Sequence, residues 1–251
     1  MGGQQGRCFS LRLACAAIGL ALASAAWGEP AEGEWSWEMT VKQLEWQDSS
    51  GPDSLMWDVS GWLGTEKNRI WVRDEGGRHV AGAARDNRLE LLWGHTLNWW
   101  GLENEILVGV RHDSGTTPSR TYAALGIQGL APLGVWVETT GYVGHGSRSG
   151  DDIHVGYRLQ AERDWQLASR LTLGVRAEYE LWSEDHVRYS EGHGPSGVSG
   201  GLRLRYALGQ SIAPYVGLEW FRLVGDTGDL ARQAGETVSE TRLVAGVRFR
   251  F

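Results

Sequence analysis

Apolar and polar side chains alternate along one segment after another through most of this chain. In the segment 170–181, for example, Leu171 and Leu173 alternate with Arg170 and Thr172. A period of two residues is typical of a β-strand that has one apolar and one polar face. The pattern predicts twelve strands, at residues 34–47, 54–65, 69–75, 87–98, 102–113, 121–131, 134–145, 153–167, 170–184, 197–208, 212–225 and 240–251.

The connections between these strands alternate in length. Short connections are expected at 65–68, 98–101, 131–134, 167–169 and 208–211. Long connections are expected at 47–53, 74–86, 112–119, 144–152, 183–196 and 225–240. Bacterial outer-membrane barrels have short periplasmic turns and longer external loops. An even number of strands then places both termini in the periplasm.

The beginning of the chain favours export. Arg7 and Arg12 precede an apolar run at 13–23, and small residues follow it. This order is typical of a secretory signal, and cleavage is expected after Gly28. An uncleaved anchor is the alternative interpretation. No later stretch is apolar for 18 residues, so no membrane-spanning helix is predicted.

Composition narrows the class of protein further. Both cysteines, Cys8 and Cys15, fall in the predicted signal, so no disulfide framework is expected. Removing Arg7 and Arg12 with the signal changes the formal charge from -7 to about -9, which argues against nucleic acid as a partner. Many glycines (36) and few prolines (6) favour a sheet protein with many turns.

A soluble β-sandwich also alternates, so the period alone does not decide the fold class. Together with the signal and the loop lengths, however, it favours a membrane barrel with apolar side chains outside and a polar lumen. We therefore predict an all-β, transmembrane, antiparallel up-and-down β-barrel of about twelve strands. The predicted domains are a signal peptide at 1–28 and a barrel at 29–251, located in the bacterial outer membrane and surrounded by its lipid.

The polar faces predict a lumen that contains charges of both signs. Rings of acidic side chains favour cations, and rings of basic side chains favour anions. Two interpretations therefore stay open, namely a plug of paired charges and a narrow acidic path for cations. The inward carboxylates are expected at Asp58, Glu90, Glu105, Glu138, Glu162, Glu178, Glu180 and Glu219. The inward arginines are expected at Arg73, Arg111, Arg158, Arg176, Arg203, Arg205 and Arg248.

Several longer motifs resemble a known family. They include "WDVSGWLGTEKNRIWVRDEG" (57–76), "GVRHD" (109–113), "ALGIQGLAP" (124–132), "GLRLRYALGQSIAPYVGLEWFRLVGDTGDLARQAGE" (201–236) and "VAGVRF" (244–249). In this order they are similar to the copper resistance protein B family of outer-membrane barrels, over roughly residues 54–251. The resemblance implies a protein that binds or conducts copper across the outer membrane. It also implies periplasmic copper-handling proteins as partners.

The chain departs from this family in one respect. Its members often carry a stretch rich in Met and His ahead of the barrel, and none is expected here, since only Met39 and Met56 follow the signal. Imidazole and carboxylate ligands suit Cu²⁺, whereas sulfur ligands select Cu⁺. We therefore expect Cu²⁺ as the metal. Its candidate ligands are the inward carboxylates and His112, His154, His186 and His193, which fall in or beside predicted external loops, although histidines in loops are usually solvated.

Two other functions stay open. The motif "RHDSG" (111–115) places His112 and Ser114 on one strand face, as an outer-membrane lipid hydrolase would require, but no third, orienting residue accompanies them. Alternatively, the barrel does not conduct and docks periplasmic copper proteins through its short turns. We expect that the protein is not an enzyme. The sequence does not determine the direction of copper transport.

Overall fold

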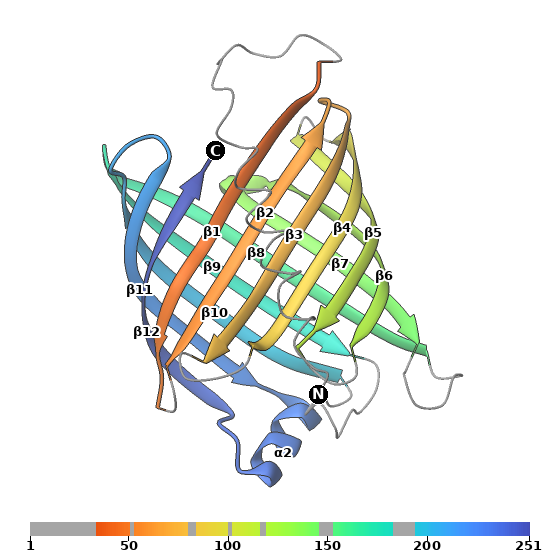
Figure 1. Cartoon of the computed structure of the whole chain (residues 1–251), viewed down its shortest axis with the longest axis vertical. Helices are drawn as coiled ribbons and strands as arrows, with labels where there is room; N and C mark the ends of the chain where they lie inside the picture. The colour runs from red at the N-terminus through yellow and green to blue at the C-terminus, as the bar shows by residue number, and fades with distance from the viewer. Residues whose placement is uncertain are drawn as a thin grey trace, which may run out of the picture.

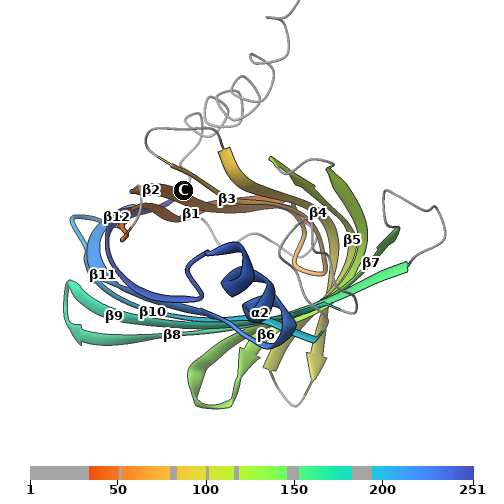
Figure 2. The ribbon, with the colours of Figure 1, turned by 90° about the horizontal axis from the view of Figure 1, so that it is seen from below.

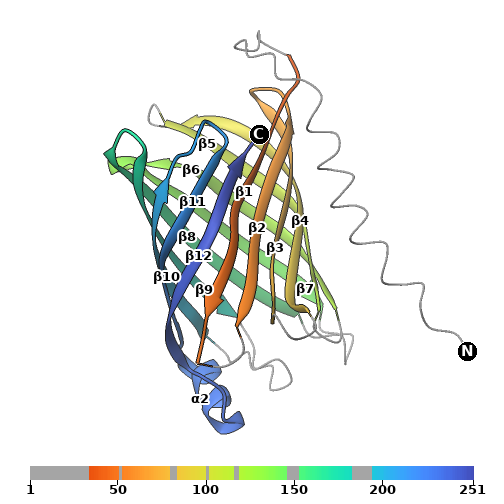
Figure 3. The ribbon, with the colours of Figure 1, turned by 60° about the vertical axis from the view of Figure 1, so that its left-hand side comes forward.

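The computed structural model describes residues 34–50, 53–79, 84–99, 102–115, 119–145, 153–182 and 194–251. It confirms a closed antiparallel barrel of twelve strands, in which each strand pairs with its neighbours in the chain and β1 pairs with β12 (Figures 1 and 3). The strands are β1 Ser36–Asp48, β2 Ser54–Gly64, β3 Asn68–His79, β4 Ala84–Trp99, β5 Leu102–Ser114, β6 Arg120–Ala131, β7 Val135–His145, β8 Ile153–Ala168, β9 Leu171–Trp182, β10 Gly194–Tyr206, β11 Ile212–Leu223 and β12 Ser239–Arg250. A short 3₁₀ turn, η1 (Pro132–Gly134), and a helix, α2 (Gly225–Ala234), complete the elements.

Within the described ranges, no helix has the length and apolar character that crossing a bilayer demands. The signal peptide predicted at 1–28 lies outside the described residues and stays a prediction.

The two faces of the wall have opposite chemistry, as the alternation predicts. On β4 and β5, Leu91, Trp93 and Val108 are exposed on the outer face, while Glu90 and Arg111 are buried on the lumen face. A soluble protein would bury the apolar set. The inversion is what lipid outside and a polar interior require.

The seam of the barrel is closed at the last residue of the chain. Phe251 donates its backbone N–H to the carbonyl of Met39 at 2.9 Å, and Met39 donates its own to Phe251 at 3.2 Å. The rings of Phe249 and Phe251 stack on the outer face with centroids 6.2 Å apart. Since no water reaches the bilayer core, closure satisfies backbone groups that would otherwise be exposed to lipid.

A β-bulge in β1 changes which side chains enter the lumen. The pairing of β1 shifts register just after Val41 against both neighbours. After the shift, Leu44 and Trp46 are exposed outside, and Glu45 is fully buried inside. Uninterrupted alternation from Val41 would have turned Glu45 toward lipid.

Two predicted loops are wrong in part. Most of the predicted loop 74–86 is strand, because β3 continues to His79 and β4 begins at Ala84. The glycines there suggest a turn, but Gly77 is instead a close-packing position, where a β-carbon would overlap the sulfur of Met56 on β2.

The predicted loop 225–240 contains the helix α2. It ends at Gly235, whose φ of 73° is the left-handed conformation that glycine adopts readily. The helix buries Thr227, Gly228 and Ala231, and the backbone N–H of Val224, just before it, bonds to the carbonyl of Ser196 on β10. Figure 2, seen from the external end, shows α2 in front of the barrel opening.

Close strand contacts make some glycines essential, and Gly109 on β5 provides a test. A β-carbon there would overlap the carbonyl oxygen of Leu91 and lie 2.7 Å from the α-carbon of Leu92. We expect Gly109→Ala to lower the free energy of unfolding by about 1–3 kcal/mol, measured by urea titration in lipid vesicles. Gly200→Ala is the matched control, because its nearest atom is 3.8 Å away. Equal stability of the two variants would contradict this account of the wall.

Candidate functional site

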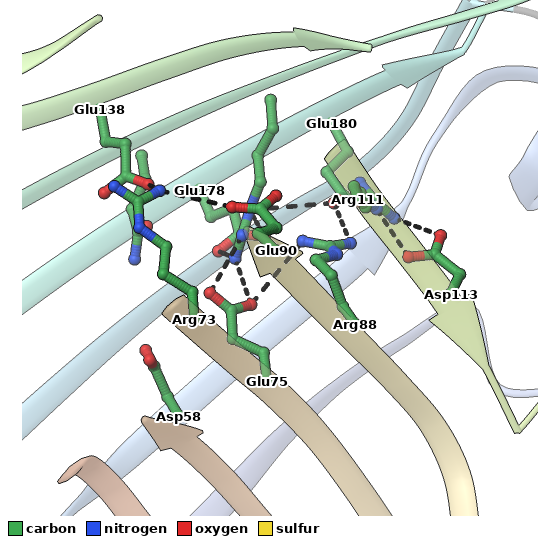
Figure 4. A network of polar contacts seen from close by, with 12 residues as sticks. Asp58, Arg73, Glu75, Arg88, Glu90, Arg111, Asp113, Glu138, Glu178 and Glu180 are labelled. Atoms are coloured by element: carbon green, nitrogen blue, oxygen red, sulfur yellow. Dashed lines mark hydrogen bonds and ion pairs between the residues drawn. The ribbon is translucent and has the colours of Figure 1, made fainter. Parts of the chain in front are cut away.

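Arginine–carboxylate pairs cross the lumen from one wall to the other (Figure 4). Arg158 on β8 donates to Glu75 on β3, with Nη1–Oε1 at 3.0 Å and Nη2–Oε2 at 2.7 Å. It also donates to Glu178 on β9, with Nε–Oε1 and Nη2–Oε2 both at 2.8 Å. One guanidinium therefore holds two carboxylates. We call the pairs that join non-adjacent strands in this way the cross-lumen ties.

Further ties lie beside this one. Arg88 on β4 donates Nη2 to Oε1 of Glu180 on β9 at 2.7 Å. Arg176 on β9 donates Nη1 to Oδ2 of Asp58 on β2 at 2.8 Å, and its Nη2 lies 3.2 Å from Glu178. The ties thus join the wall of β2–β4 to the wall of β8 and β9. In Figure 2 these two walls face each other across the lumen.

Arg73 on β3 is also shared by two carboxylates. It bonds to Glu138 on β7 and lies 3.5 Å from Glu90 on β4. Tyr142 donates its hydroxyl to Glu90 at 2.7 Å. Gln128 on β6 accepts a bond from Arg73 at 2.6 Å, so the group is fully connected by hydrogen bonds.

Another shared arginine lies under the bulge. Arg203 on β10 donates to Glu45 on β1 at 2.7 and 3.1 Å, and to Glu219 on β11 at 2.8 Å. Both Arg203 and Glu45 are buried. A buried charge of this kind costs several kcal/mol unless it is paired, and breaking such a pair is strongly destabilising.

An aromatic cluster fills the lumen near the inner faces of β4–β9. Tyr142 and Trp182 pack around Arg111, whose guanidinium carbon is 4.5 and 5.4 Å from their ring centroids. Arg111 also donates two bonds of 2.7 Å to Asp113. The remaining members of the cluster are Leu92, Leu107, Tyr122 and Ala124.

All eight predicted carboxylates lie on the lumen face, and each has a partner. Glu105 accepts bonds from Trp71 at 2.9 Å and Gln128 at 2.7 Å, and Glu162 accepts one from Gln160 at 3.0 Å. In the seven described ranges, no three His, Cys, Asp or Glu side chains converge as a metal centre would require. Metal binding by these residues therefore stays a prediction.

The predicted histidines do not come together. His112 is exposed on the outer face of β5, while His154 on β8 is 4% exposed and faces the lumen. His186 and His193 lie outside the described residues. On the outer face, Nδ1 of His112 is 2.9 Å from the hydroxyl of Thr121, and among the described residues no hydrogen bond joins His112 to Ser114. The structure therefore shows no serine activated by this histidine.

Some members of the ties were missed from sequence. Glu45 was missed because of the bulge, although the shift of the apolar positions from odd (Trp37, Met39) to even (Leu44, Trp46) signals it. Glu75 was missed because it lies where the predicted strand 69–75 overlaps the predicted loop 74–86. Glu75 lies two residues after the inward Arg73, so continued alternation along β3 would have placed it in the lumen.

Comparison with known proteins agrees with this fold. The solved NanC porin superimposes with a TM-score of 0.54 at 12% identity, covering 85% of this chain and 99% of that chain. At that identity the likeness shows the fold alone, an outer-membrane barrel.

Sequence comparison is more specific. The family described as copper resistance protein B precursor matches residues 35–251. Copper resistance protein B of Escherichia coli is 37% identical over 212 residues, which cover 84% of this chain and 68% of the relative. The copper resistance protein B homolog of Pseudomonas syringae pv. tomato is 35% identical over 211 residues, covering 83% and 68%. The chain belongs to the copper resistance protein B family, as the resemblance of its barrel motifs predicted.

Proposed function

We propose that this outer-membrane barrel serves copper resistance by passing Cu²⁺ through its lumen along the carboxylates of the cross-lumen ties. The observation that carries the proposal is the sharing of Arg73, Arg158 and Arg203, each by two carboxylates. The Arg73 and Arg203 groups each contain one positive and two negative charges. Around Arg158, the three arginines Arg88, Arg158 and Arg176 share five carboxylates, which are Asp58, Glu75, Glu162, Glu178 and Glu180, so negative charge is again in excess. A lumen lined in this way favours a cation.

The chemistry of the lining favours Cu²⁺ over Cu⁺. Carboxylate oxygen suits the divalent ion, whereas Cu⁺ prefers sulfur. The lumen face contains Met56, opposite Gly77, while Met39 is on the outer face of β1. In the described part of the chain, oxygen ligands therefore far outnumber sulfur in the lumen.

The ties also make the path narrow and closed at rest. A guanidinium shared by two carboxylates can swing toward one of them and release the other to a metal ion. Copper would then advance by replacing arginine at one carboxylate after another, at low flux. The short periplasmic turns are where a copper-handling protein would deliver or collect the ion.

The barrel acts without catalysis in this proposal. Its family and its porin-like fold suggest a non-enzymatic role. Consistent with this choice, no hydrogen bond joins His112 to Ser114 within the described residues.

Copper flux into liposomes tests the path. We expect the purified barrel to admit Cu²⁺ above the level of empty liposomes. Changing Glu138, Glu162, Glu178 and Glu180 to Gln is expected to lower the flux roughly tenfold, the effect of losing ~1.4 kcal/mol of ion binding. The matched control removes four exposed carboxylates by Glu66→Gln, Asp226→Asn, Asp229→Asn and Glu236→Gln, and it keeps the flux. No flux in the wild type would mean that the ties are a permanent plug and that the barrel docks a partner instead.

A second test removes a shared arginine. In Arg158→Met, Glu75 and Glu178 lose the guanidinium between them, and we expect the free energy of unfolding to fall by about 3–5 kcal/mol. A Cu²⁺ ion has the charge that two carboxylates require, so added copper should restore part of this loss. Thermal unfolding with and without Cu²⁺ measures both effects.

The control for this test is Arg232→Met, which breaks the exposed pair of Arg232 with Asp229 in α2. It should cost less than about 1 kcal/mol and show no added response to copper. If copper stabilises Arg158→Met no more than it stabilises the control, the carboxylates of the tie are not copper ligands.

A further inference from the structure

A small cavity interrupts the packing of the lumen near its periplasmic end. It lies between β1, β8, β9, β10 and β12 and has a volume of about 20 Å³. Its charged lining is unlike that of the ties, because five cationic side chains meet one carboxylate, Glu162. The cationic side chains are Lys42, Arg176, Arg203, Arg205 and Arg248.

Three of these cations are already engaged. Arg176 and Arg203 belong to the cross-lumen ties described above. Arg205 donates two bonds, of 2.8 and 2.7 Å, to the carboxylate of Asp164. These arginines contribute positive potential to the cavity, while their hydrogen bonds are directed elsewhere.

The other two cations are under-satisfied. Arg248 makes one long ion pair, 3.8 Å to the Asp164 carboxylate that Arg205 already holds, and no hydrogen bond within the described residues. Lys42 makes neither a hydrogen bond nor an ion pair within 4.0 Å in that same part of the chain. The carboxylates of Asp58 and Glu162 attract Lys42 only from a greater distance. Both cations are half-buried, and a cation partly removed from water is costly without a partner of opposite charge.

We propose that this cavity binds one small inorganic anion, chloride, between Lys42 and Arg248. Two donors with spare capacity face one space, and their neighbours Arg176, Arg203 and Arg205 add to the attraction for an anion. The volume decides the size of the ligand, because about 20 Å³ holds roughly one water-sized particle. A halide is close to a water molecule in size and fits that space.

The anion reaches this site from the periplasm. The side chain of Arg248 is 32% exposed and that of Asp164 is 49% exposed, so the cavity opens toward the nearby end of the barrel. The lumen would thus combine an acidic network for cations with an adjoining anion site that shares Arg176 and Arg203 with it. The anion site stands on its own geometry and does not require that copper passes through the barrel.

Thermal unfolding in detergent tests the site. Wild-type barrel is compared in sodium chloride and in sodium gluconate of equal ionic strength, which equalises the screening of the lumen ion pairs. Gluconate is too large for the cavity. We expect chloride to raise the unfolding midpoint by about 2–4 °C with a saturating dependence on concentration.

Variants then locate the effect. Lys42→Met should abolish the chloride-specific shift, while Arg250→Met should keep it, because Arg250 pairs with Glu38 outside the cavity. Crystals of the wild type grown in bromide should show an anomalous peak between Lys42 and Arg248, a result that needs no variant to fold. An absent chloride-specific shift, a shift retained in Lys42→Met, or a bromide peak only elsewhere would each overturn the proposal.

Discussion

The cost of enclosing charge inside a narrow barrel governs this structure. Twelve strands place a row of carboxylates and arginines on the inner wall, too far from bulk water to be left single. The arrangement that satisfies them is one guanidinium between two carboxylates, as Arg158 lies between Glu75 and Glu178. Because the three residues come from β8, β3 and β9, the same bonds hold opposite walls at a fixed distance.

Details of the wall serve these ties. The bulge in β1 turns Glu45 inward to meet Arg203, and it turns Leu44 and Trp46 outward to lipid. Gly77 packs closely against Met56 in the part of β3 that continues past Glu75, and the carboxylate of Glu75 meets Arg158. A local change in backbone thus decides which charges enter the lumen. The bulge in β1 therefore affects the charge of the lumen as well as the shape of the wall.

The lumen is divided along its axis. Around the ties, carboxylates outnumber the arginines that they share, in a chain of the copper resistance protein B family. Near the periplasmic end, Lys42 and Arg248 face a cavity with an excess of positive charge. A copper ion that travels the lumen would meet these two potentials in turn. The sign of the lumen charge therefore changes along the barrel axis.

The sequence by itself determined the strands, the orientation of most of their faces and the family. Alternation is local, and each strand of the barrel repeats it, so Glu90, Glu178 and Arg203 could be assigned to the lumen from their neighbours alone. It could not show that Arg158 holds Glu75, because these residues are 83 positions apart and meet only when the sheet closes. Nor did it show α2, whose glycines suggest a loop until packing against β10 stabilises the helix. An inward charge is either paired or, like Lys42, left facing a cavity. Distances across the barrel decide between the two, and only the tertiary structure sets these distances.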